Sequence, residues 1–213
     1  MFDTMKYEEV LSSWPSDGKH ILASYDEDTI LVYQAYKPEI GEPSISNQRL
    51  CGPGLKLERM SWIKPNFLWM MYRSGWGTKK QQETTLGIRI SRSFFDEILA
   101  AAVASSFRAS PYDDNDAWRS AMQASDVRLQ WDPDHDPFGA KVDRRAIQLG
   151  LRGEVWRRFI EEETLEILDL TGFVDEQRRR LERHGVGSIH VPSERVYVPG
   201  SADALENVGL DLL

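Results

Sequence analysis

The sequence has a single cysteine, Cys51, among 213 residues. A disulfide within the chain is therefore excluded, and so is a zinc or iron–sulfur site built from several of its cysteines. An unpaired thiol is typical of proteins that work in a reducing compartment. We expect a cytoplasmic protein.

Long apolar runs are also absent from the sequence. The longest, residues 98–104, has seven residues, whereas a membrane-spanning helix needs about 20. The first ten residues include Asp3, Glu8 and Glu9 and no apolar segment, so we expect no secretory signal. The sequence predicts no membrane span and no membrane partner.

Several motifs of known chemistry are missing. The sequence has neither GxGxxG nor GxxxxGK[ST], so it supports neither a Rossmann fingerprint nor a P-loop. It has no GxSxG, which disfavours an α/β-hydrolase. The histidines form no HxH or HExxH pair, so we expect no metal site. They are His20, His135, His184 and His190.

Positive charge is scarce overall but concentrated in one stretch. The net charge is −8, from 26 basic and 34 acidic residues, which argues against a protein that coats nucleic acids. Between Arg49 and Arg92, however, nine basic residues are opposed by Glu58 and Glu83 alone, so this stretch carries +7. A cationic stretch in an acidic protein fits a small anionic ligand in a pocket, and equally a solvated surface that balances acidic neighbours.

β-Branched and aromatic residues mark the expected strands, and amphipathic periodicity marks the expected helices. Strands are expected at residues 20–25, 29–36, 84–90, 126–131, 145–151 and 164–169, with helices at 39–50, 64–72, 94–105, 153–161 and 175–184. This order predicts a single α+β domain over residues 1–213, with a mixed or antiparallel sheet flanked by helices. We expect an ordered core over about residues 5–190 and a weakly ordered tail over about 192–213.

The densest aromatic segment, residues 59–76, interleaves cations with large rings. Stacking on the rings, together with Arg or Lys, can hold a planar anionic ligand, of which a nucleotide is the simplest. Cation–π packing inside an ordinary core explains the same pattern. Four side chains are expected to be mostly buried: Trp62, Phe67, Leu68 and Trp69. The candidate ligand contacts are Arg59, Lys64, Tyr72, Arg73 and Ser74.

Tyrosines and glutamines on the expected strands are further candidates for ligand contacts. Gln34 and Tyr36 share one strand face because side chains alternate along a strand. A buried Gln34 needs several partners, so it either lines a wet pocket or pairs with neighbouring backbone. Gln130 and Gln148 each stand in an apolar strand, where paired amides can read a base or an amide ligand, or face solvent. Tyr25 completes the set.

Five segments of the sequence resemble the DUF4291 family. They are DTILVYQAY at residues 28–36, RMSWIKP at 59–65, LWMMYRSGW at 68–76, QWDP at 130–133 and IQLGL at 147–151. The resemblance extends over about residues 19–175, and the family has no generally established reaction, so it implies kinship rather than a function. Members tend to carry arginines in the first strand. This chain has Lys19 and Leu22 there, so a phosphate contact made by such an arginine would be weakened or changed.

We expect an enzyme that acts on a nucleotide-like or other anionic aromatic ligand. One version is an NAD-consuming, ADP-ribosyltransferase-like enzyme, since such sites use a basic or imidazole group on an early strand and a glutamate on a late one. His20 and Glu163 stand at such places and would be the catalytic pair, although a solvated helix end also explains the acidic residues 161–163.

Three alternatives remain open at this point. The first is a tailoring enzyme that acts on a small aromatic metabolite without NAD. The second is a non-catalytic module that binds a nucleotide or nucleic acid in an aromatic cage, against which the net charge of −8 counts. The third is an interaction domain whose aromatic residues all belong to the core.

Overall fold

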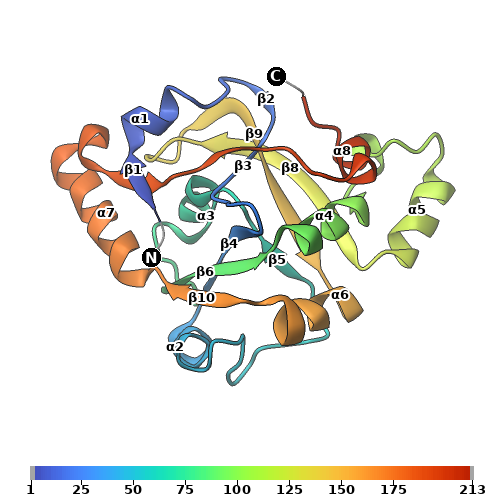
Figure 1. The fold of residues 1–213 in the computed structure, drawn as a ribbon, viewed down its shortest axis with the longest axis horizontal. Helices are drawn as coiled ribbons and strands as arrows, with labels where there is room; N and C mark the ends of the chain where they lie inside the picture. The colour runs from blue at the N-terminus through green and yellow to red at the C-terminus, as the bar shows by residue number, and fades with distance from the viewer. Residues whose placement is uncertain (1–2, 212–213) are drawn as a thin grey trace.

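The computed structural model describes residues 3–211, which form eight α-helices and twelve strands. The strands lie in mixed and antiparallel sheets with helices around them (Figure 1), so the expected α+β fold is confirmed. Among these residues, no helix is both long enough and apolar enough to span a membrane.

A three-stranded antiparallel sheet runs through the molecule. Its order is β10–β6–β4, and its strands are β4 (Thr29–Tyr36), β6 (Thr84–Ser91) and β10 (Glu166–Asp169). β4 and β6 pair over their whole length, from Thr29 opposite Ser91 to Tyr36 opposite Thr84. Most residues of both strands are buried, and β4 accordingly has a nearly continuous apolar run, whereas β6 alternates apolar residues with Gly87, Arg89 and Ser91.

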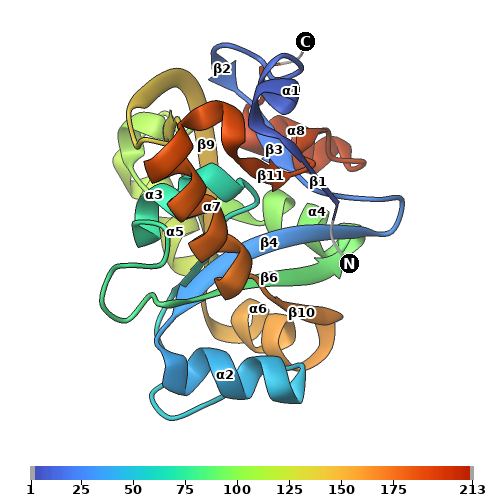
Figure 2. The same ribbon diagram turned by 90° about the vertical axis from the view of Figure 1, so that its left-hand side faces the viewer.

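Two hydrophobic clusters pack on opposite faces of this sheet. Ile30 and Val32 belong to one cluster and Leu31 and Tyr33 to the other, because neighbouring side chains of a strand point to opposite faces. The helix α7 (Thr171–His184) lies across the face of Leu31 and Tyr33 (Figure 2). Both clusters are built on β4, so neither packs as a separate unit.

The second sheet is mixed and is dominated by a long hairpin. Its strands are β2 (Gly18–Lys19), β9 (Lys141–Leu151), β8 (Val127–His135) and β7 (Ala102–Ala104), in that order, with β5 (Ser61–Ile63) also paired to β9. β8 and β9 are antiparallel, whereas β2 and β7 add parallel edges. β8 continues past its expected end at residue 131. A bulge between Pro133 and His135 accommodates a proline that cannot donate to the ladder.

Segments near the two ends of the chain pair with each other, which corrects the expectation of a weakly ordered tail. β1 (Thr4–Lys6) pairs with β11 (His190–Pro192), and β3 (Ile21–Ala23) pairs with β12 (Arg195–Tyr197) (Figure 1). Tyr197 is fully buried, because it fills the main core beside the first strands. Residues 212–213 of the expected tail lie outside the described range.

Local signals account for most of the helices. The Ser91 hydroxyl accepts the Phe94 N–H and so caps α4 (Arg92–Ala100). The expected helix at 153–161 is instead α6 (Gly153–Arg158) followed by a π-helical segment, Phe159–Glu163. The remaining helices are α1 (Tyr7–Leu11), α2 (Pro38–Asn47), α3 (Phe67–Ser74), α5 (Asn115–Ala124) and α8 (Ala202–Val208), with short 3-10 turns at Phe107–Ala109 and Val186–Ser188.

Candidate functional site

Polar side chains from both sheets converge on one pocket of about 420 Å³, which we call the Lys64 pocket. β4, β5 and the β8–β9 hairpin provide its walls, together with α3. Six residues that the sequence marks as ligand contacts line it: Gln34, Tyr36, Lys64, Arg73, Gln130 and Gln148. The lining also includes Met60, Ser61, Trp62, Met70 and Gln82, which the sequence analysis did not single out as ligand contacts.

Lys64 stands where the two sheets meet. β5 pairs with β9 of the second sheet, and the residue after β5 pairs with β4 of the first. The Tyr33 N–H donates to the Lys64 carbonyl at 2.7 Å, and the Lys64 N–H donates to the Tyr33 carbonyl at 3.3 Å. The chain then leaves the sheet, since Pro65 follows and α3 begins at Phe67. This junction places the lysine between strands that are far apart in the sequence.

The Lys64 side chain is buried without a carboxylate partner. The residue is 5% exposed, and its amine donates to the Trp62 carbonyl at 3.3 Å. It forms no ion pair with any residue in the range 3–211. Burial lowers the pKa of Lys64 to about 7, aided by the charge of Arg73 and opposed by that of Asp132. The amine therefore changes its protonation state close to neutral pH.

Gln34 organises the wall formed by β4 and β5. Its Nε2 donates to Ser61 Oγ at 2.9 Å and to the Trp62 carbonyl at 3.2 Å, and its Oε1 accepts the Tyr36 hydroxyl at 3.0 Å. Gln34 therefore both lines the pocket and bonds to neighbouring backbone. Burial raises the pKa of Tyr36 to about 12, so its hydroxyl stays protonated at neutral pH. The wall presents hydroxyl groups in a fixed arrangement.

Gln130 and Gln148 face each other across the β8–β9 hairpin. Their amide nitrogens donate to the two carboxylate oxygens of Asp132, at 2.9 and 2.6 Å respectively. Within the described residues, neither amide oxygen accepts a hydrogen bond, so both are available as acceptors. Asp132 was missed in the sequence, although its position two residues after Gln130 places it on the same strand face.

Arg73 reaches the pocket from the last turn of α3. Its side chain is exposed, and its guanidinium makes neither an ion pair nor a hydrogen bond with any residue that the structure describes. A guanidinium in this state can receive a carboxylate or phosphate through two parallel hydrogen bonds. Arg73 and Lys64 are thus two cations that lack an internal anion.

The aromatic residues of segment 59–76 lie partly in the core and partly at the pocket. Phe67, Leu68 and Trp69 are buried, as expected. Trp62 is partly exposed, which still agrees with the expectation of a mostly buried residue, and it lies on the pocket wall. Its ring is therefore accessible to a planar ligand.

Two candidate residues on α3 take no part in the Lys64 pocket. The Tyr72 ring is 40% exposed and stacks on His135, with ring centroids 3.5 Å apart. The buried Ser74 hydroxyl donates to the Met71 carbonyl at 3.4 Å and accepts the Gly77 N–H at 3.2 Å. Ser74 therefore stabilises the end of the helix.

Tyr25 and Arg59 also lie outside this pocket. The Tyr25 hydroxyl donates to the Val196 carbonyl at 2.9 Å, and the Arg195 guanidinium lies 3.9 Å from its ring centroid. Tyr25 thus helps to hold the C-terminal strand. Arg59 lines a second pocket, of about 400 Å³, which shares Ser61 with the first.

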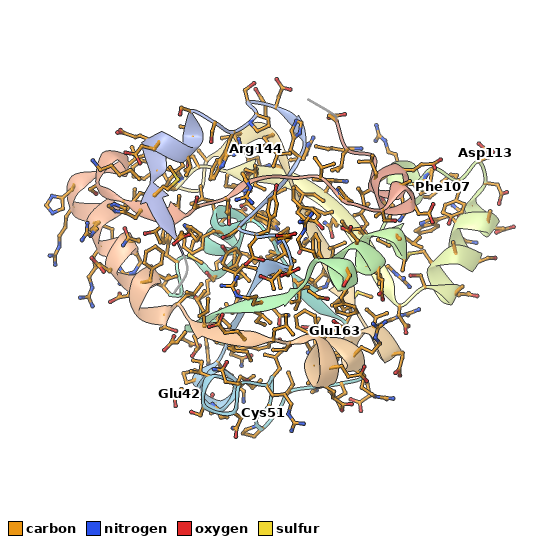
Figure 3. All side chains as sticks on the ribbon, viewed as in Figure 1. Glu42, Cys51, Phe107, Asp113, Arg144 and Glu163 are labelled. Carbon is orange, nitrogen blue, oxygen red and sulfur yellow. The ribbon has the colours of Figure 1, made fainter. Side chains whose placement is uncertain are left out.

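The structure does not bring His20 and Glu163 together. His20 is buried and lines a different pocket with Tyr197. Glu163 ends the π-helical segment (Figure 3), where it pairs with Arg158 at 2.9 Å and accepts the Ser91 hydroxyl at 3.1 Å. Neither residue lines the Lys64 pocket. Their pairing as catalytic residues has no geometric support, since the acidic group is engaged in joining α6 to α4.

The pocket combines three kinds of contact. Lys64 and Arg73 supply positive charge, the amides and hydroxyls supply hydrogen bonds, and Trp62 supplies an aromatic face. Within residues 3–211, no three His, Cys, Asp or Glu side chains lie together as a metal ion would require. The set suits a planar anionic ligand.

A family model described as "Domain of unknown function (DUF4291)" matches residues 20–197. The match includes every residue of the Lys64 pocket and confirms the resemblance inferred from the sequence motifs. No curated protein matches the chain.

Proposed function

This chain belongs to the DUF4291 family, and we propose that it is an enzyme that acts on a nucleotide-like or other planar anionic ligand in the Lys64 pocket. One observation carries the proposal: two cations, Lys64 and Arg73, line a polar pocket in which the nearby Asp132 is engaged by two glutamines. A buried cation without a counter-ion is costly, so an external anion is its natural partner.

The hydrogen-bonding groups indicate what else the ligand carries. The free amide oxygens of Gln130 and Gln148 accept hydrogen bonds from N–H groups, such as those on the edge of a nucleobase. Trp62 offers a face on which a ring can stack. Arg73 then takes the phosphate or carboxylate. A ring with polar edges and an attached anion meets all three requirements.

Lys64 is the residue that favours an enzyme over a non-catalytic binding module. Its pKa of about 7 lets the amine accept or donate a proton at neutral pH. The amine lies inside the pocket, where a reacting hydroxyl of the ligand can approach it. We therefore assign Lys64 as the general acid or base. The proposal does not extend to ADP-ribosyl transfer or to NAD as cofactor, because His20 and Glu163 lie elsewhere.

A thermal-shift screen tests the binding step. The panel contains nucleoside monophosphates, aromatic carboxylates and their uncharged parent compounds. We expect anionic members to raise the melting temperature of the native chain, since a ligand that binds the folded state stabilises it. The Arg73→Gln variant should lose the shift and keep its own melting temperature within about 2 °C, because the side chain is exposed.

The matched control is Arg119→Gln, which removes the same charge from an exposed site on α5. This variant should retain the full ligand-induced shift. The proposal is wrong if no anionic compound raises the melting temperature, or if Arg73→Gln and Arg119→Gln respond alike.

A further inference from the structure

The second pocket borders the Lys64 pocket, and we call it the Arg59 pocket. The two share Tyr36, Met60 and Ser61, so these residues form a common wall. Their volumes, about 420 and about 400 Å³, each lie near the lower end of the usual range for ligand sites, which is roughly 300–1,000 Å³. A ligand that crosses the common wall would occupy both.

The Arg59 pocket is also cationic. Lys37, Lys56 and Arg59 line it, and no carboxylate does. None of the three forms an ion pair with any residue of the described chain. Gly54, whose φ is +94°, allows the backbone of the loop to turn beside Lys37. The backbone of this loop thus brings cations from two segments to one place.

A buried donor lies beside the Arg59 pocket and lacks a partner within the described chain. Trp156 lines this pocket and is 1% exposed. Its indole N–H finds no acceptor among residues 3–211. A buried donor that lacks an acceptor destabilises the fold, and a ligand oxygen that reached this N–H after a small movement of the side chain would remove that penalty.

The order of charges across both pockets limits the ligand further. Lys64 and Arg73 stand at one end, and the three cations of the Arg59 pocket at the other. The common wall between them carries two hydroxyls, Tyr36 and Ser61, which lie 3.4 Å apart and are uncharged. A ligand with two adjacent phosphates, such as a diphosphate, would need cations close together rather than on both sides of an uncharged wall. Separated cations instead match two anionic groups joined by an uncharged, hydroxyl-bearing spacer.

We infer that the two pockets form one site for a nucleoside bisphosphate, a ligand whose two phosphates flank a ribose. The ribose lies against Tyr36 and Ser61, one phosphate meets Arg73, and the other meets Arg59 and Lys56. This inference rests on the proposed function, because it names the substrate class of the same site. The net charge of −8 favours a free bisphosphate over a nucleic-acid strand.

Isothermal titration in a buffer with EDTA tests the inference with three probes: adenosine 5′-monophosphate, adenosine 5′-diphosphate and adenosine 3′,5′-bisphosphate. The guanosine, cytidine and uridine counterparts complete the set. For each base, the 5′-diphosphate and the 3′,5′-bisphosphate carry two phosphates each and differ in the position of the second phosphate. We expect the 3′,5′-bisphosphate of the preferred base to bind about tenfold more tightly than the monophosphate, and more tightly than the diphosphate.

Two double variants separate local contacts from overall charge. Lys56→Gln/Arg59→Gln should lose the preference for the bisphosphate but keep the affinity for the 5′-monophosphate. Arg108→Gln/Arg119→Gln removes the same charge from exposed residues that line neither pocket, and it should behave like the native chain.

The outcomes distinguish the two proposals. If the monophosphate binds and the bisphosphate gains nothing, or if the diphosphate binds as tightly, the two-pocket inference is overturned and the proposed function stands. If no nucleotide binds, the two-pocket inference is overturned, and the proposed function fails only if the aromatic carboxylates of the thermal-shift panel do not bind either. If a single-stranded oligonucleotide binds more tightly than the bisphosphate and loses affinity steeply with salt, the ligand is a strand and the inference is again overturned.

Discussion

Lys64 owes its chemistry to its surroundings rather than to its residue type. Its amine is withdrawn from water beside another cation, Arg73, and Asp132 compensates in part. Burial and a like charge both disfavour the ammonium form, which lowers the pKa of Lys64 to about 7. An exposed lysine elsewhere on this chain, such as Lys80, lacks that burial.

The Lys64→Met substitution should change how stability depends on pH. The folded-state pKa of about 7 lies below the usual 10.5, so between these values the unfolded chain holds a proton that the folded chain has released. The free energy of unfolding of the native chain should therefore rise with pH in this window, by at most about 1.4 kcal/mol per pH unit. The stability gained from releasing this proton is fully present above pH 10.5 and is lost as the pH falls through 7.

Urea unfolding at about pH 7.5 and about pH 9 measures this contribution as a difference between the native chain and the variant. The comparison cancels other groups that titrate in the same window. We expect the variant to be the more stable chain at the lower pH, with the difference shrinking as the pH rises. Parallel pH dependences for the two chains would show that Lys64 keeps an ordinary pKa.

Trp69 and Trp62 allow a second comparison of buried and accessible side chains. Trp69 is 6% exposed and stacks on Tyr72 and His135, with ring centroids 5.3 Å away in both cases. Trp69→Ala should lower the free energy of unfolding by roughly 3–5 kcal/mol, because it removes buried surface and leaves a cavity. Trp62→Ala should cost about half as much or less, since Trp62 is half-buried. Equal losses in denaturant unfolding would contradict this assignment.

Capping residues fix where the short helix α3 begins and ends. The Asn66 side chain accepts the Trp69 N–H at 2.6 Å and caps the first turn. Gly75 ends the helix in the left-handed region, with φ at +59°. Between these residues, α3 carries Arg73 to the pocket and its apolar side chains to the core. The orientation of Arg73 therefore depends on both caps.

Asn66→Ala should destabilise the protein by about 1 kcal/mol, because it removes the cap of α3. Asn66→Ser keeps a side-chain oxygen at the cap and should recover much of the loss. Thermal unfolding of the two variants and the native chain checks the order. The capping role is refuted if the serine and alanine variants unfold at the same temperature.

The C-terminal segment completes the core by packing against elements that lie far from it in the sequence. The segment after Pro192 adds β12 to the edge of β3 and places Tyr197 and α8 in the main core. The Tyr197 hydroxyl donates to Asp96 Oδ1 at 2.6 Å, which ties this segment to α4. The C-terminal segment therefore belongs to the core as much as the central strands do.

A chain that ends at residue 193 should not fold stably, because it loses β12, α8 and the buried Tyr197 side chain. A chain that ends at residue 199 keeps β12 and should be less severely affected. Circular dichroism and size-exclusion chromatography of both truncated chains measure the effect. If the shorter chain melts cooperatively near the temperature of the full chain, the segment is dispensable and this account of the core is wrong.

Local sequence signals were sufficient for much of the fold and for the chemical composition of the candidate site. Strand alternation placed Gln34 and Tyr36 on one face, and β4 has the expected bounds, because its residue types suit a strand at every position. The Ser91 cap of α4 is a local feature of the same kind, since its hydrogen bond acts within three residues. The tail was misjudged because the few apolar residues of 193–211 gain their partners from distant parts of the chain, from β3 for β12 and from α4 for α8.

The sequence by itself determined which residue types this protein offers to a ligand: amides and tyrosines on strands, and cations among aromatic rings. Only the tertiary structure decided which of them meet. β5 pairs with β9, and Lys64 then pairs with Tyr33, so one short strand joins two sheets and brings Gln34 and Gln148 into one pocket. His20 and Glu163 do not line that pocket. Such contacts depend on strand pairing between distant segments, and the spacing of residues along the chain does not predict which strands pair.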